Sequence, residues 1–227
     1  MKIYRVGGSV RDELMGLKPK DVDYAIEANS FDAMRQEILA RGCQIFLETP
    51  QFFTIRAKDA VLGVVDFALC RKDGIYRDGR RPEDVSVGTI YDDLARRDFC
   101  ANAIAVDVVS GEVLDPFGGI QDIKDKVLRA VGDVNQRFEE DKLRALRAIR
   151  FSLTKGFSLA SDVDMAILSL GLDDFKGVST DRIRDELHKM FVFDTVEAMR
   201  IISSEYVIFG KLMQERKLWL KPTSEKV

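Results

Sequence analysis

Two acidic residues separated by one apolar residue, Asp21 and Asp23 around Val22, are the first feature of the chain that could do chemistry. Alternate side chains of an extended strand point to one face, so both carboxylates would lie together there. Two carboxylates at such a short distance repel each other unless a cation binds between them. In enzymes of in-line nucleotidyl transfer, that cation is usually one of a pair of Mg²⁺ ions. A solvated strand edge would carry the same acids without a metal, so the pair alone leaves both interpretations open.

A third acid, Asp66, lies within an apolar run at residues 64–68, where an unpaired charge is costly. It is the natural candidate for completing the catalytic group beside the attacking hydroxyl. The chain has one histidine and three well-separated cysteines that form no CxxC pair. Because zinc sites need such ligands, we expect a carboxylate-held ion, Mg²⁺ or alternatively Mn²⁺, with Asp21 and Asp23 as its ligands.

A glycine turn precedes the acid pair and could hold phosphates. Gly7 and Gly8 follow a predicted strand and open a predicted helix, where backbone N–H groups can approach an anion closely. Ser9 could donate a hydrogen bond, and Arg11 supplies a positive fork for a triphosphate. A simple turn would have the same glycines, so the argument depends on the acid pair that follows.

The elements that must position these residues change in character along the chain. The first half predicts strands separated by short turns, one capped helix at residues 31–40, and a charged mobile loop at residues 71–90. From about residue 135 the pattern becomes helical. The predicted strands cover residues 2–6, 22–26, 52–56, 61–69 and 103–109, and the later helices residues 138–153, 161–170, 179–191 and 195–203. This pattern predicts an α+β fold with a mostly antiparallel or mixed sheet.

The composition limits the location and the partners. The chain has 227 residues, 46% of them hydrophobic, and a formal net charge of −3. It contains no apolar run of the roughly 20 residues that cross a membrane, and its first residues do not resemble a signal peptide. We therefore expect a cytoplasmic protein without membrane association. The bulk charge does not indicate a nucleic-acid partner, so RNA would have to bind a local basic surface.

The glycine turn followed by the acid pair resembles the signature of the polymerase-β superfamily. More narrowly, it resembles the class II tRNA nucleotidyltransferases, or CCA-adding enzymes, and their relatives, the bacterial poly(A) polymerases. Four further segments match the blocks of that family in order, so the resemblance extends over about residues 1–200. They are residues 96–105 (RRDFCANAIA), 115–123 (DPFGGIQDI), 140–151 (EDKLRALRAIRF) and 179–187 (STDRIRDEL).

This resemblance implies both an architecture and an activity. It implies a polymerase-β-like nucleotidyltransferase head with a mixed sheet over residues 1–134, followed by an all-helical neck over residues 135–227. The implied activity is template-independent addition of C and A, from CTP and ATP, to the 3′ end of tRNA. Asp21 and Asp23 would bind the metals, Gly8 and Arg11 would hold the triphosphate, and Arg97 would contact the sugar or the phosphates.

The resemblance also implies that amino acids select the incoming base. Asp141 and Arg144 are three residues apart, which on one helix makes them neighbours on one face. The carboxylate would accept from the exocyclic amino group that C and A share, and the guanidinium would donate to a ring nitrogen or carbonyl. Arg147 and Arg150 continue this spacing and could add nucleotide contacts. An ordinary surface ion pair and a solvated helix face are the simpler alternatives.

Several alternatives remain open from the sequence. Addition of A alone or of CC alone and poly(A) synthesis are the related activities, and the charged segment at residues 71–90 favours CCA or A addition over CC addition. A small-molecule nucleotidyltransferase would not need Asp141 and Arg144, and a non-catalytic RNA-binding relative would not need the three acids. Members of the family carry further body and tail domains that hold the tRNA. The alternatives left open here are binding of the acceptor end alone, a homodimer, a partner protein, or a compact form whose substrate is not full tRNA.

Overall fold

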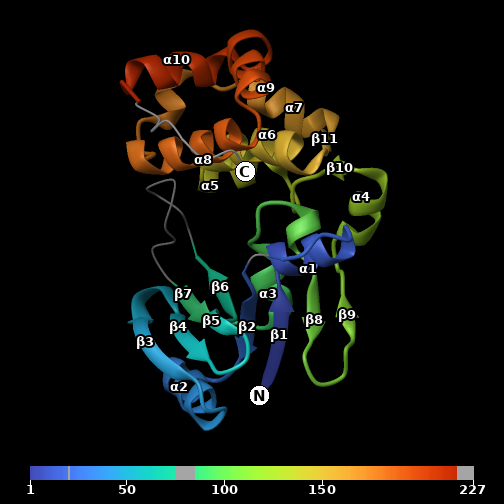
Figure 1. The fold of residues 1–227 in the computed structure, drawn as a ribbon, viewed down its shortest axis with the longest axis vertical. Coiled ribbons are helices and arrows are strands. Elements are labelled where there is room, and N and C mark those ends of the chain that lie inside the picture. The colour runs from blue at the N-terminus through green and yellow to red at the C-terminus, as the bar shows by residue number, and fades with distance from the viewer. Residues whose placement is uncertain (20, 75–84, 219–227) are drawn as a thin grey trace. The chain divides into compact units, whose positions relative to one another are not determined.

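The computed structural model describes residues 1–19, 21–74 and 85–218, which form two compact units (Figure 1). One unit comprises residues 1–74 and 85–125, and the other comprises residues 126–218. The loop predicted over residues 71–90 is wrong at both ends, because residues 71–73 and 85–87 pair as two antiparallel strands and a helix begins at Ile90. Residues 75–84 lie outside the described residues. A division into domains at residues 134 and 135 stays a prediction. No helix of the described part of the chain is long and apolar enough to span a membrane.

The first unit is built on a mixed sheet, as predicted. In the described residues this sheet has seven strands in the order β3-β4-β5-β2-β1-β8-β9. Only β2 and β5 run parallel, and every other neighbouring pair is antiparallel. Its strands are β1 (Lys2–Val6), β2 (Asp23–Glu27), β3 (Gln44–Thr49), β4 (Thr54–Asp59), β5 (Gly63–Leu69), β8 (Ala105–Asp107) and β9 (Val113–Leu114).

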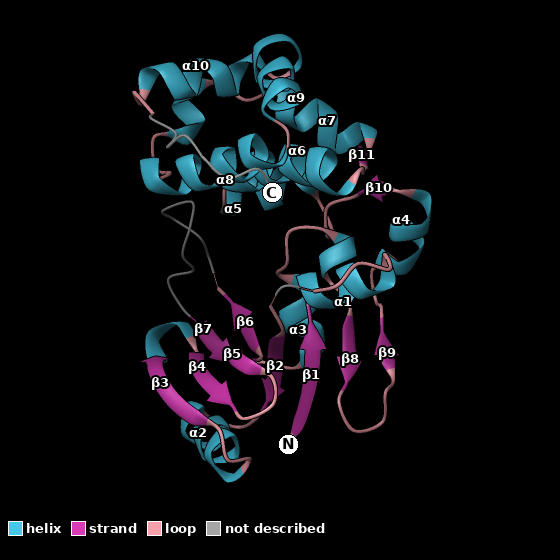
Figure 2. Ribbon diagram, in the orientation of Figure 1, coloured by secondary structure: helices cyan, strands magenta, loops and turns pink. Residues whose placement is uncertain are grey.

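Short helices and a small hairpin surround this sheet (Figure 2). The α-helices are α1 (Gly8–Leu14), α2 (Phe31–Ala40), α3 (Ile90–Ala95) and α4 (Gly119–Asp125), the 3₁₀ turns are η1 (Pro50–Phe52) and η2 (Cys100–Asn102), and the hairpin pairs β6 (Arg71–Asp73) with β7 (Val85–Val87). Helix α2 begins where the sequence predicts, because the Ser30 side chain accepts a hydrogen bond from the Ala33 N–H at 3.1 Å.

The core of the first unit lies on one face of the sheet. Met34 and Ile38 of α2 pack there with Ile26 of β2, Ile55 of β4 and Phe67 of β5, and all five side chains are buried. Because side chains alternate along a strand, the residues next to these point to the other face. The carboxylates and the guanidinium described below lie on that opposite face.

The second unit is helical apart from a short parallel strand pair. Helix α6 packs against α8, and burial of the apolar stripes of these helices forms the core of the unit. The pair β10–β11, two residues in each strand, is the departure from the all-helical expectation. The elements of the second unit are β10 (Val127–Leu128), α5 (Val134–Glu140), α6 (Leu143–Lys155), β11 (Ser158–Leu159), α7 (Ser161–Leu168), η3 (Leu172–Phe175), α8 (Thr180–Phe193), α9 (Thr195–Arg200), π-helical η4 (Ile201–Glu205) and α10 (Val207–Glu215).

The single helix predicted over residues 138–153 is wrong. The chain leaves α5 at Asp141, whose φ of −157° and ψ of 103° are extended, and α6 begins at Leu143. The Asp141 carboxylate accepts a hydrogen bond from the Leu143 N–H at 3.1 Å, which satisfies a donor at the start of α6. Short acidic side chains bind nearby backbone groups in this way, and this interrupts a helix that the apolar pattern alone would continue.

Candidate active site

The acids of the first unit meet across neighbouring strands. Asp23 begins β2, and the strand register places it opposite Asp66 of β5. Both side chains lie on the face opposite the core, and Asp23 is exposed to solvent. Asp21 is also exposed but precedes the strand in a bend, so the expectation that Asp21 and Asp23 alternate along one strand is wrong. The two strands thus bring together Asp23 and Asp66, with Asp21 close by in sequence.

The electrostatics of Asp23 show that these acids interact. Removal of water by the surrounding protein, followed by the negative charge of Asp66 and then of Asp21, raises the pKa of Asp23 above its usual value, although Arg97 and Arg56 oppose the shift. A divalent ion would relieve this repulsion, and carboxylate oxygens are the donors that Mg²⁺ and Mn²⁺ accept. Chemically, therefore, the set fits such an ion. Within the described part of the chain, however, no three acidic, cysteine or histidine side chains already converge as a ligand set.

An arginine that the sequence argument missed binds one of these acids. Arg56 of β4 lies opposite Asp66 in the strand register, and its Nε and Nη2 atoms donate to the two Asp66 oxygens at 2.7 Å each. In the sequence, Arg56 is marked only by its position between two apolar residues of a strand, as any exposed strand residue would be.

The glycine turn lies beside Asp23. Gly7 has a φ of +71°, a conformation that favours glycine. A Cβ atom at Gly7 would lie 2.8 Å from Nη1 of Arg97 and 3.9 Å from Oδ2 of Asp23. The turn, the predicted nucleotide-binding arginine and the Asp23 carboxylate therefore converge at one place, and the positive φ of Gly7 would strain any larger residue there. Gly8 follows as the first residue of α1.

Ser9 and Arg11, which follow this turn, form buried hydrogen bonds within the protein. The buried Ser9 hydroxyl donates to the Val6 carbonyl oxygen at 3.0 Å, so in this structure its proton is directed into the protein. The buried Arg11 guanidinium donates to Asp12 Oδ1 at 2.7 and 2.9 Å and to Asn102 Oδ1 at 2.6 Å. Their predicted contacts with a triphosphate stay predictions.

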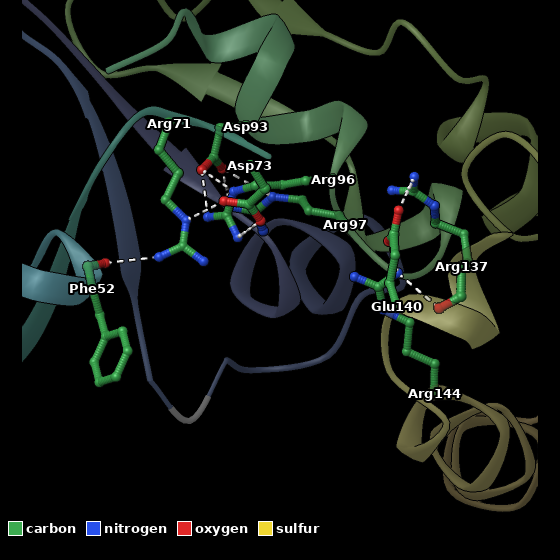
Figure 3. Close-up of polar contacts among 9 residues, drawn as sticks. All are labelled: Phe52, Arg71, Asp73, Asp93, Arg96, Arg97, Arg137, Glu140 and Arg144. Atoms are coloured by element: carbon green, nitrogen blue, oxygen red, sulfur yellow. Dashed lines mark hydrogen bonds and ion pairs between the residues drawn. The ribbon is translucent and has the colours of Figure 1, made fainter. Parts of the chain in front are cut away.

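Arg97 is held by an acid that lies entirely inside the protein. Asp93 of α3 is 0% exposed, and its Oδ2 accepts from Arg97 Nη2 at 2.9 Å while its Oδ1 accepts from Arg96 Nη2 at 2.6 Å (Figure 3). Burial alone would raise the pKa of Asp93, but Arg96 and Arg97 outweigh it and hold the pKa below its usual value. Arg97 Nη1 also donates to the Asn102 carbonyl oxygen at 3.3 Å.

The same buried cluster continues to the hairpin β6–β7. Arg96 Nη1 lies 3.9 Å from Asp73 Oδ2, and Asp73 Oδ1 lies 2.8 Å from Arg71 Nε. Arg71 Nη1 donates to the Phe52 carbonyl oxygen at 2.9 Å (Figure 3). A chain of charged groups therefore connects η1 and β6 to the arginine beside the glycine turn.

In the second unit, Asp141 and Arg144 have separate partners. Arg144 Nη1 donates to Glu140 Oε2 at 2.6 Å, and Arg137 Nη2 donates to Glu140 Oε1 at 2.5 Å (Figure 3). Asp141 instead accepts from Arg182 of α8 at 2.5 and 3.3 Å. The expectation that Asp141 and Arg144 share the face of one helix is wrong, because α6 begins only after Asp141.

Arg147 and Arg150 converge on one buried carboxylate of α8. Glu186 is 4% exposed and pairs with Arg150 Nε, and its Oε1 lies 3.9 Å from Arg147 Nη1 and 2.8 Å from Lys189 Nζ. Burial alone would raise the pKa of Glu186, but Arg150 and then Arg147 outweigh it and lower the pKa. The Arg150 guanidinium also lies 4.0 Å from the centre of the Phe151 ring.

The sequence prediction did not identify three acids as partners that orient arginines. They are Asp12, Asp93 and Glu140. Asp93 precedes Arg96 and Arg97 by three and four residues, and Glu140 precedes Arg144 by four. The Asp93 spacing is one that brings side chains together on a helix and was a usable signal, whereas Glu140 and Arg144 lie on two different helices. The complete burial of Asp93 depends on the fold and was not visible in the sequence.

Comparison with known proteins identifies the family. A family model described as the poly A polymerase head domain matches residues 3–129, which is more than half of the chain. The CCA-adding enzyme of Anoxybacillus flavithermus is 37% identical over 216 residues, which cover 92% of this chain and 51% of the relative. The CCA-adding enzyme of Geobacillus stearothermophilus is 38% identical over 194 residues, covering 82% and 45%. The chain spans about half the length of these relatives.

Solved structures agree with this assignment. The Bacillus stearothermophilus CCA-adding enzyme in complex with CTP superimposes with a TM-score of 0.77 at 29% identity, over 93% of this chain and 51% of that one. The Thermotoga maritima CCA-adding enzyme complexed with tRNA gives a TM-score of 0.73 at 26% identity, over 97% and 50%. This chain therefore belongs to the poly(A) polymerase head domain family, the nucleotidyltransferase family that includes the CCA-adding enzymes.

Proposed function

We propose that this chain adds C and A nucleotides, taken from CTP and ATP, to the 3′ end of tRNA without a nucleic-acid template. One observation carries the proposal: the Asp23 carboxylate lies beside the Gly7 turn and Arg97 and is paired in register with Asp66. Relatives that bind CTP and tRNA support the choice of substrates.

Asp21 and Asp23 would hold Mg²⁺, or alternatively Mn²⁺, and Asp66 would complete the catalytic group. When bound, these ions activate the attacking 3′ hydroxyl and offset the charge that develops on the phosphates. Gly8, Ser9 and Arg11 would line the triphosphate site. Arg97 presents a guanidinium fork that suits phosphate oxygens, and Asp93 fixes its orientation before the nucleotide arrives.

Asp141 and Arg144 would select the base. The Asp141 carboxylate would accept from the amino group of C or A, and its ion pair with Arg182 holds its position. Arg144, oriented by Glu140, would donate to the same base edge. Arg147 and Arg150 would make supporting nucleotide contacts through the guanidinium N–H groups that do not face Glu186.

Three related activities are the alternatives: addition of A alone, addition of CC alone, and poly(A) synthesis. The whole enzyme's activity and its grip on tRNA belong to the proposal, because the chain spans about half the length of its relatives.

The test incubates the full chain with tRNA transcripts that end before CCA, before CA or before A, with each nucleoside triphosphate separately, and with Mg²⁺. We expect C on the first two transcripts, A on the third, and full CCA with CTP and ATP together. Long A tails would indicate poly(A) synthesis, and no extension of any transcript in Mg²⁺ or Mn²⁺ would refute the proposal. Sequencing gels resolve these products.

A further inference from the structure

Arg56 lies in the row of charged residues that crosses three neighbouring strands. The register pairs Arg56 of β4 with Asp66 of β5, and Asp66 with Asp23 of β2. Because paired residues of adjacent strands share a face, all three side chains lie on the face away from the core. Asp66, the middle member, contacts the guanidinium through both of its oxygens at 2.7 Å each.

The charge of Arg56 also acts on the other acids of the site. The hydrogen bonds and charge of Asp66 raise the pKa of Arg56, and Asp21 and Asp23 raise it further. Conversely, Arg56 is one of the two arginines that oppose the upward shift in the pKa of Asp23. A single fixed positive charge thus partly neutralises the three carboxylates among which a divalent ion would bind.

We propose that Arg56 competes with the divalent ion for Asp66, so that Asp66 can act as the third carboxylate of the metal site only after its ion pair with Arg56 opens. Both oxygens of Asp66 are occupied by the guanidinium, and the three acids do not form a converged ligand set in the described residues. The inference rests on the proposed function, because it concerns the metal of that reaction. It makes Arg56 a positioning residue that sets metal affinity.

The size of the effect follows from exposure and charge. The side chains of Arg56 and Asp66 are 48% and 43% exposed, so solvent weakens their attraction and the pair can open. Removing the arginine frees Asp66 and removes a repulsive charge next to a divalent ion. We expect these changes together to tighten metal binding by about three- to tenfold.

The test measures Mn²⁺ binding to the full chain by electron paramagnetic resonance of the free ion, without nucleotide or RNA. The variant Arg56→Gln removes the guanidinium and keeps a polar side chain on an exposed position. The matched control is Arg35→Gln, because Arg35 forms an ion pair with Glu48 at 2.9 Å with 38% and 31% exposure in the same unit. Thermal unfolding of both variants checks that each one is folded.

We expect Arg56→Gln to bind Mn²⁺ about three- to tenfold more tightly than the wild type, while Arg35→Gln stays within about twofold. In an Asp66→Asn background the gain from Arg56→Gln should fall below about twofold, because the two residues act as a pair. An unchanged or weaker affinity in Arg56→Gln overturns the inference. A gain that persists in the Asp66→Asn background overturns it too, because Arg56 would then act by charge alone.

The variant Asp23→Asn separates this inference from the proposed function. If the wild type and Asp23→Asn bind Mn²⁺ equally, or neither binds it, the proposed metal site is refuted and the inference about Arg56 is refuted with it. If Asp23→Asn removes the ion and Arg56→Gln leaves the affinity unchanged, only the role of Arg56 fails.

Discussion

The two units of this protein hold their reactive side chains in different ways. In the first unit, strand register places Asp23 opposite Asp66, and the exposed Asp23 depends on the backbone for its position. In the second unit, buried acids of helices hold the arginines, and Glu186, the most buried of them, is 4% exposed. The sheet therefore presents its acids at the surface, whereas the helical unit makes charge part of its core. Substitutions should remove chemistry from the first unit and stability from the second.

The largest expected effect is on chemistry in the sheet. Asp23→Asn should lower nucleotide incorporation by about 10³-fold or more, because it removes a metal-binding carboxylate. The fold should persist, since Asp23 is exposed and its strand lies within an intact ladder. Single-turnover incorporation and circular dichroism measure both properties.

The control for this variant is Glu37→Gln, which removes a carboxylate from a surface pair with Arg41. It should leave incorporation unchanged. If Asp23→Asn retained more than a tenth of the wild-type rate in Mg²⁺, the acids of the sheet would not be the catalytic group of the first unit.

The second effect is on stability in the helical unit. Glu186→Gln should lower the free energy of unfolding at neutral pH by about 3 kcal/mol, because it leaves Arg150 and Arg147 without a buried counter-charge. The pKa of Glu186 is lowered on folding, so the ionised group stabilises the protein above its unfolded pKa. The difference from wild type should therefore shrink as the pH falls below about 4.

Urea unfolding across a pH series tests this prediction, with Glu197→Gln as the control. Glu197 forms a solvent-exposed pair with Arg200, so its loss should leave the free energy of unfolding nearly unchanged. Equal costs for the two variants would show that the buried acid of α8 contributes no more than a surface ion pair.

The third effect tests an exception within the first unit, where the buried Asp93 supports an arginine of the site. Asp93→Asn should weaken CTP binding by about tenfold, because Arg97 loses its charged partner and part of its orientation. Arg96→Gln is the control, since Arg96 shares the Asp93 carboxylate but extends toward Asp73.

Both variants disturb the same buried cluster, so the comparison is made on the dissociation constant of CTP, measured by calorimetry on folded protein. We expect Arg96→Gln to stay within about threefold of wild type. Equal losses of affinity in both variants would contradict a specific role for Asp93 in orienting Arg97.

The smallest effect concerns base selection. Arg182→Gln should lower the preference for C and A over U and G by about three- to fivefold, because Asp141 loses a partly exposed partner that orients it. Arg184→Gln, on the same helix but paired with the exposed Asp181, should leave the preference unchanged. Competition between nucleotides on one tRNA transcript measures the ratio, and an unchanged ratio in Arg182→Gln would remove Arg182 from base selection.

The parts of the fold that follow local rules were predictable from the sequence. Strand β1 and helix α2 have the predicted bounds, because apolar spacing and the Ser30 cap act locally. Strand β3 was missed, since its side chains do not alternate between buried and exposed positions. The interruption at Asp141 was missed as well, because the helical apolar pattern continues through a residue whose side chain binds the Leu143 N–H and, from far away in the sequence, Arg182.

The candidate site divides in the same way. The glycine turn and the acids were visible because each is a short pattern with a chemical purpose. Arg56 was not, since its relation to Asp66 exists only once β4 and β5 pair. Complete burial of Asp93 is likewise a property of the assembled unit. Sequence therefore predicts the groups that react better than the groups that orient them.

The ring stack on the core face next to the acids has a consequence for folding errors. Tyr24 and Phe67 follow Asp23 and Asp66 in their strands, and their ring centres lie 5.5 Å apart. Sliding β5 by a single residue would turn Phe67 toward water and Asp66 into the hydrophobic core. Misaligned molecules therefore cannot accumulate as slightly impaired enzymes, because the same slip that separates the acids also removes the aromatic contact. Partial activity in a preparation would then report a mixture of intact and inactive molecules rather than a uniformly weakened population.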